Sequence, residues 1–113
     1  MISIIISSEF SDTPGGRYIS ESTFSGEEFR EKILLPKYEE AIKKHEKLLI
    51  DFDGCFGFGT SFLEEAFGGM VREHSKMGIL NHIVIKSTED ETIPDYVNRY
   101  IKAAEDIKKG NMK

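Results

Sequence analysis

Residues 48–67 read LLIDFDGCFGFGTSFLEEAF. The first residues of this stretch are nearly all apolar, as in a strand that is buried between parallel neighbours. A glycine-rich turn follows, and from about Ser61 the apolar residues recur at the three- and four-residue spacing of a helix. The stretch therefore predicts a strand, a loop and a helix, with Ser61 at the start of the helix. In α/β folds this is the edge of the sheet at which binding sites lie.

The flanking sequence supplies the other elements of an α/β domain. Ser25 and Glu28 have the spacing of a capping box, and Pro36 predicts either a kink near Leu35 or two abutting helices. Predicted strands are residues 2–7, about 17–20, 47–53 and 82–86, and predicted helices are residues 26–45, about 61–76 and one that begins near Pro94.

This order of elements predicts one α/β domain over residues 1–107, followed by a flexible C-terminal tail over residues 108–113. We expect a four-stranded mixed sheet with about three helices, in which the strand near residue 17 pairs with the first strand. The two later strands, residues 48–52 and 82–86, should be adjacent and parallel, because each βα unit returns by a right-handed crossover.

Composition narrows the class of protein. Of the 113 residues, 39% are hydrophobic and 31% are charged, which is ordinary for one globular domain with its own core. The net charge of −5 and the lack of a basic block argue against binding to nucleic acid or to a membrane surface. The single cysteine, Cys55, cannot form an intramolecular disulfide, and no signal segment opens the chain. We therefore expect a cytoplasmic location.

Four motifs carry a resemblance to a known family. They are DFDG at residues 51–54, TSFLEEAFGGM at 60–70, PGGR at 14–17 and SGEEFR at 25–30. Together they resemble an uncharacterised bacterial STAS-like family, over about residues 14–101. That family is similar in turn to the STAS domains of anti-sigma factor antagonists. The resemblance implies a single-domain STAS-like α/β fold.

The resemblance also implies a regulatory, protein-binding function. Anti-sigma factor antagonists use a strand-to-helix loop with the sequence DSSG to meet a histidine-kinase-like ATPase, which phosphorylates a serine of the loop. By position, Ser61 corresponds to that serine and Thr60 to its neighbour, whereas Gly59 replaces Asp and Phe62 replaces Gly. The implied partner is such an ATPase or an anti-sigma-type regulator, and Ser61 and Thr60 are the phosphorylation candidates. The expected partner surface consists of Phe56, Phe58, Gly59, Thr60, Ser61, Phe62 and Glu65.

Simple structural roles compete with function at three points of this stretch. Ser61 and Thr60 both have the residue type of a helix N-cap, and with Ser61 at the cap Glu64 would complete a capping box. Phe56 and Phe58 either plug the edge of the core or remain exposed for a partner. Gly68–Gly69, in the middle of the predicted helix, indicates a close approach of its backbone to another element.

An enzymatic function is the main alternative. Asp51, Asp53 and Gly54 match the first motif of haloacid-dehalogenase-like phosphatases, in which Asp51 would be the nucleophile and Asp53 the acid/base. Lys86 would belong to the second motif, and Mg²⁺ would be required. Cys55 replaces the usual threonine, however, and little chain remains after the second motif for a metal-binding one. The sequence therefore favours turn-forming roles for the aspartates and a binding module without a cofactor or metal.

Overall fold

The sheet has three strands in a computed structural model that describes residues 1–110. The strands are parallel and lie in the order β1-β2-β3, so that β2 is central. Ile4 of β1 pairs with Ile50 of β2, and both side chains are fully buried. The predicted parallel pairing of the two later strands is confirmed. The strands are β1 (Ile2–Ile5), β2 (Leu48–Asp51) and β3 (Ile83–Lys86).

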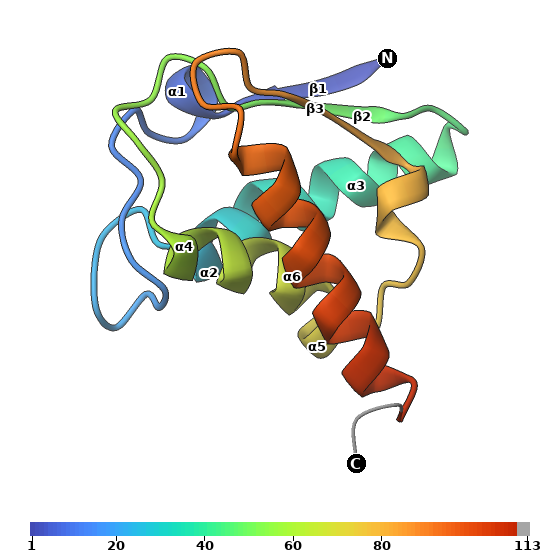
Figure 1. The fold of residues 1–113 in the computed structure, drawn as a ribbon. Coiled ribbons are helices and arrows are strands. Elements are labelled where there is room, and N and C mark those ends of the chain that lie inside the picture. Colours follow the sequence, from blue (N-terminus) through green and yellow to red (C-terminus); the bar gives the residue numbers. More distant parts are fainter. Residues whose placement is uncertain (111–113) are drawn as a thin grey trace.

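The longer helices lie on one side of this sheet, as Figure 1 shows. Two series of helical segments follow one another without a break, over residues 26–43 and 60–74, and each contains a π-helical turn. The helical segments are α1 (Ile6–Glu9), α2 (Gly26–Phe29), η1 (Arg30–Leu34), α3 (Leu35–Lys43), α4 (Thr60–Leu63), η2 (Glu64–Gly68), α5 (Gly69–His74), η3 (Ile79–Asn81) and α6 (Ile93–Lys108).

The predicted helix signals have clear structural counterparts. The Ser25 hydroxyl accepts a hydrogen bond from the Glu28 backbone N–H at 3.1 Å, which confirms the cap at the start of α2. Pro36 lies in the first turn of α3, directly after the π-helical η1, so the predicted irregularity takes the form of a wider turn before the proline. Pro94 lies in the first turn of α6.

The predicted fourth strand at residues 17–20 is wrong, and the sheet in residues 1–110 is parallel rather than mixed. The backbone N–H groups of Glu21 and Ser22 both donate to the carbonyl of Tyr18, at 3.0 and 3.2 Å, and so close a turn. The Arg17 carbonyl accepts from the N–H of Glu27 at 3.0 Å. These local bonds tie the segment to α2 instead of to the edge of the sheet.

The ends of two predicted segments also shift. The first strand ends at Ile5, because α1 begins at Ile6. Lys108, the first residue of the predicted tail, is the last residue of α6, and residues 111–113 lie outside the described residues. Within the described range, every helix is too short or too polar to cross a membrane.

Candidate functional site

The loop between β2 and α4 meets two other loops at the carboxyl edge of the sheet. The backbone N–H of Phe56 donates to the carbonyl of Asp12, in the loop after α1, at 2.8 Å. The backbone N–H of Gly54 donates to the carboxylate of Glu89, in the loop after β3, at 2.8 Å. Because all three loops are joined by hydrogen bonds, the loop after β2 has a defined position on the sheet.

The two aspartates of the loop form turns. Asp51 Oδ1 accepts from the backbone N–H of Asp53 at 2.9 Å, and Lys86 Nζ lies 3.5 Å from Asp51 Oδ2. Asp53 accepts from the Thr88 hydroxyl at 2.7 Å and from the Glu89 backbone N–H at 3.0 Å. The hydrogen bond from Thr88 lowers the pKa of Asp53 below its ordinary value. The Asp51 carboxylate, at the end of β2, therefore closes a turn at the start of the loop, and the Asp53 carboxylate holds this loop to the loop after β3.

The two phenylalanines of the loop have different environments. Phe58 is half-buried, and its ring centroid lies 5.1 Å from that of Phe52 and 5.7 Å from that of Phe62, so it closes the edge of the core. Phe56 is 85% exposed. Gly57 lies between the two phenylalanines, and Gly59 follows them. Among the described residues, no atom lies within 4 Å of the place where a Cβ of either glycine would be. The exposed part of the loop therefore presents the phenyl ring of Phe56, and after it the backbone of Gly57 and Gly59, which carry no side chain.

Ser61 is an exposed residue of the first turn of the helix and not its cap. The N-cap is Gly59, whose carbonyl accepts from the N–H of Leu63 at 3.2 Å, and among the described residues no side chain caps this helix. Thr60 is also exposed. Glu64 bonds arginines instead of completing a capping box. The interpretation of Ser61 or Thr60 as an N-cap is therefore wrong, because the helix begins at Thr60 and its N-cap is Gly59, two residues before Ser61.

Two residues of the expected partner surface are buried. Phe62 is fully buried, with its ring centroid 5.7 Å from that of Phe29 in α2. Glu65 is 5% exposed. The side of the helix that carries Glu65 faces α2 and not the solvent, so neither side chain is available to a partner in this structure. Of the expected surface, Phe56, Gly59, Thr60 and Ser61 remain exposed.

Glu65 belongs to an arginine cluster that the sequence analysis missed. We use this name for Arg17, Arg30, Arg72, Glu64 and Glu65. Arg30 Nη1 lies 2.6 Å from Glu65 Oε2 and donates to the Glu65 carbonyl at 2.8 Å. Arg17 Nη1 lies 2.5 Å from Glu64 Oε1 and 3.2 Å from Glu65 Oε1. Arg72 contacts the same two carboxylates. The cluster joins α2–η1, the loop before it and the helix of residues 60–74.

Ion pairing shifts the pKa values of Glu64 and Arg30 in the arginine cluster. Burial raises the pKa of Glu64, but the hydrogen bonds and charges of Arg72 and Arg17 outweigh it, and the pKa lies below its ordinary value. Burial lowers the pKa of Arg30, but the hydrogen bonds to Glu65 and Glu31, together with the charges of these two carboxylates, outweigh it, and the pKa is raised. Each buried charge is therefore balanced by a partner of opposite sign.

Gly69 was the one sequence signal for this cluster. A Cβ at Gly69 would overlap Arg30 Nη1 and lie 3.0 Å from Arg30 Cζ, so the glycine makes room for the buried guanidinium. The predicted close approach to another element is confirmed for Gly69, whereas the neighbours of Gly68 are Glu64 and Arg72 of its own helix. The sequence did not indicate that the neighbour would be an arginine from η1.

We predict that Gly69→Ala destabilises the protein. Alanine favours a helix over glycine by about 1 kcal/mol, but displacing a buried, doubly bonded guanidinium costs about 1–3 kcal/mol as overpacking does, so the net effect is a loss. Thermal melts measure it. The control is Gly16→Ala, because a Cβ at Gly16 would lie at ordinary contact distance, 3.4 Å, from the Ser22 hydroxyl oxygen. A melting temperature for Gly69→Ala at or above that of Gly16→Ala would contradict the packing argument.

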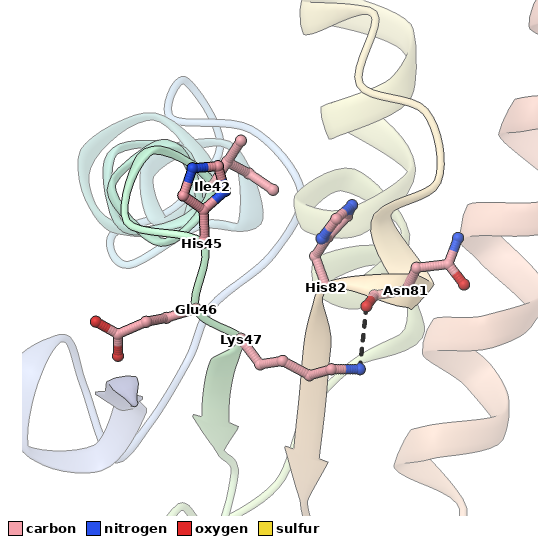
Figure 2. A pocket seen from close by; sticks show the side chains of 6 residues that line it. All are labelled: Ile42, His45, Glu46, Lys47, Asn81 and His82. Carbon is pink, nitrogen blue, oxygen red and sulfur yellow. Dashed lines mark hydrogen bonds between the residues drawn. The ribbon is translucent and has the colours of Figure 1, made fainter.

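The opposite edge of the sheet carries a shallow pocket of about 370 Å³. Figure 2 shows its six residues, which precede β2 and β3 or end α3. Lys47 Nζ donates to the Asn81 carbonyl at 3.1 Å across it. The exposed His45 and His82 line the pocket, but none of the predicted site residues does. The pocket is therefore separate from the loop after β2.

The fold and the loop define the class of the protein. One parallel sheet with helices on one side, and an exposed strand-to-helix loop at its carboxyl edge, make a single α/β domain of STAS-like type. The model of the family described as STAS-like domain of unknown function (DUF4325) matches residues 25–92, more than half of the chain, and the chain belongs to this family. The predicted resemblance is thereby confirmed. No curated protein and no solved structure matches the chain.

Proposed function

We propose that the protein is a regulatory module that binds another protein through residues 54–61. The observation that carries this proposal is Phe56, a phenyl ring that is 85% exposed on a loop held by hydrogen bonds to two other loops. Burying such a ring is worth about 1.5–3 kcal/mol, which a partner would gain on binding. Because the loop is already positioned, little conformational entropy would be lost.

The proposed partner is a histidine-kinase-like ATPase that phosphorylates Ser61, as in the anti-sigma factor antagonists that STAS-like domains resemble. Membership of a STAS-like family supports the regulatory role. The exposure of Ser61 and Thr60 supports the modification, because a kinase can reach either hydroxyl without unfolding the helix. Ser61 is the first candidate and Thr60 the second.

The test is phosphorylation by such an ATPase from the same genome, with ATP and with mass spectrometry to locate the phosphate. We expect modification of Ser61 in the wild type and in Thr60→Val, and its loss in Ser61→Ala. Modification that persists in Ser61→Ala at another site, or none with any such ATPase of the genome, would reject the proposed switch.

We also propose that the domain binds rather than catalyses. Asp51 and Asp53 hold turns, so we expect no hydrolysis of p-nitrophenyl phosphate in the presence of Mg²⁺. Asp51→Asn should change only the melting temperature, and by a small amount, because an amide oxygen can still accept from the Asp53 N–H and the pair with the exposed Lys86 contributes at most about 1 kcal/mol. Mg²⁺-dependent turnover that Asp51→Asn abolishes would instead establish the phosphatase alternative.

A further inference from the structure

The backbone of Arg17 lies beside the first turn of the helix that carries Ser61. The carbonyls of Gly16 and Arg17 accept hydrogen bonds from the N–H groups of Gly26 and Glu27, at 2.8 and 3.0 Å. Gly26 in turn touches the residue after Ser61, since a Cβ at Gly26 would lie 2.5 Å from the Phe62 carbonyl oxygen. The loop of residues 12–24 is thus fixed next to the start of α4 at this one point.

The side chain of Arg17 lies over the same turn. Its Nη1 is 2.5 Å from Glu64 and 3.2 Å from Glu65, which follow Ser61 by three and four residues. Helical residues at these spacings are neighbours, with about 5–6 Å between their Cβ atoms. Glu64 Oε2 extends toward Gly68 and pairs with Arg72. Arg17, whose backbone lies beside the turn of Phe62, therefore reaches the carboxylates from the side of Ser61.

Arg17 can leave its carboxylates without leaving a buried charge unpaired. Glu64 would keep Arg72, and Glu65 would keep Arg30. The Arg17 side chain is 29% exposed, whereas that of Arg30 is 5% exposed and enclosed by the helix. Arg72 lies about three turns beyond Ser61 on the helix, too far along the axis to replace Arg17.

We propose that Arg17 binds the phosphate when Ser61 is phosphorylated, and that phosphorylation thereby moves the loop of residues 12–24. The inference rests on the proposed function and identifies the group of this chain that responds to the modification. A phosphate carries nearly two charges and three acceptor oxygens, so it outcompetes a carboxylate that already has a second arginine. Arg17 also lies 5.9 Å from the ring centroid of Tyr18, so its movement changes the surroundings of that partly exposed ring.

The test needs neither a kinase nor a partner. Phosphoserine is incorporated genetically at position 61, and the second pKa of the phosphate is measured by ³¹P NMR titration. With Arg17 present we expect this pKa about one unit below its usual value near 6, a tenfold change in proton affinity, because a neighbouring cation favours the dianion. Arg17→Gln should return the pKa to its usual value, and Arg17→Lys should retain part of the shift.

Arg99→Gln is the matched control, because it removes the same charge from α6, where Arg99 lies 5.3 Å from the ring centroid of Tyr96. It should leave the shift unchanged. The chain contains no tryptophan, so Tyr18→Trp gives a single fluorescent reporter of the loop, whose emission should change on phosphorylation.

Equal phosphate pKa values in the wild type and in both Arg17 variants would overturn the proposal, as would a shift that Arg99→Gln removes. Unchanged emission of the Tyr18→Trp variant on phosphorylation would overturn the loop movement. These results do not depend on a kinase or on partner binding. Failure of the proposed function would therefore be recognised separately: Arg17 would bind the incorporated phosphate, but no ATPase would phosphorylate the protein.

Discussion

Replacing Glu65 with glutamine is expected to lower the free energy of unfolding by about 3–5 kcal/mol. This is the loss typical of proteins in which one partner of a buried ion pair is removed. Glu65 and Arg30 have side chains that are 6% and 5% exposed, with 2.6 Å between Oε2 and Nη1. An amide fills the same volume but carries no charge, so the buried Arg30 guanidinium would keep only the exposed Glu31 carboxylate, 2.8 Å from its Nε, as a charged partner. For a domain whose total stability is about 5–15 kcal/mol, the loss is large.

Thermal and urea melts measure this loss, and Glu40→Gln is the control. Glu40 pairs with Lys44 at 3.0 Å, but their side chains are 41% and 55% exposed, so this pair contributes less than about 1 kcal/mol. Replacing both Arg30 and Glu65 by apolar residues should restore much of the stability, because no buried charge then lacks a partner. Equal melting temperatures for Glu65→Gln and Glu40→Gln would contradict a structural role for the arginine cluster.

The arginine cluster also marks the limit of what the sequence could predict. A helical pattern places Glu64 and Glu65 away from the apolar residues, which is the usual position of solvated charges. The burial of Glu65 depends on Arg30, which lies 35 residues earlier and reaches it across the contact between two packed helices. No local pattern encodes such a pair. Gly69 indicated that something approached the helix, but a missing side chain does not identify its neighbour.

Local signals predicted the elements more reliably than their pairing. The apolar run at residues 48–52 predicted a central parallel strand because both faces of such a strand are buried. Residues 17–20 have strand-forming side chains, but pairing needs an edge with free backbone groups in register. The turn at Tyr18 and the bonds to α2 use those groups first. The first βα unit therefore connects parallel strands, and the sheet has no antiparallel member in residues 1–110.

The placement of Ser61 in the fold was predictable, and its details were not. The order of strand, glycine loop and helix placed Ser61 in the first turn of the helix that follows β2, where it is found. The pattern did not distinguish Ser61 from Gly59 as the cap, because both residue types are favoured there. It also did not separate Phe56 from Phe58. Which ring enters the core depends on the backbone path through Gly57, whose φ of +145° few other residues adopt.

Ser61→Asp is expected to weaken binding of the proposed ATPase partner more than 100-fold while leaving the fold intact. A carboxylate in the first turn of a helix is neutral or stabilising, by about 0.3–1 kcal/mol. The same charge, desolvated at an interface where the partner supplies no matching cation, costs several kcal/mol, and each 1.4 kcal/mol is tenfold in affinity. Isothermal titration measures the affinity, and thermal melts measure the stability of each variant.

Two variants separate charge from position. Ser61→Ala should retain binding and change stability by less than about 0.5 kcal/mol, because Ser61 makes no capping bond that could be lost. Ser75→Asp adds the same charge at the other end of the helix, at the exposed C-cap of α5, and should retain the wild-type affinity. Equal affinities for Ser61→Asp and the wild type would reject Ser61 as a switch, whereas equal losses for Ser61→Asp and Ser75→Asp would show that net charge, and not the loop of residues 54–61, controls binding.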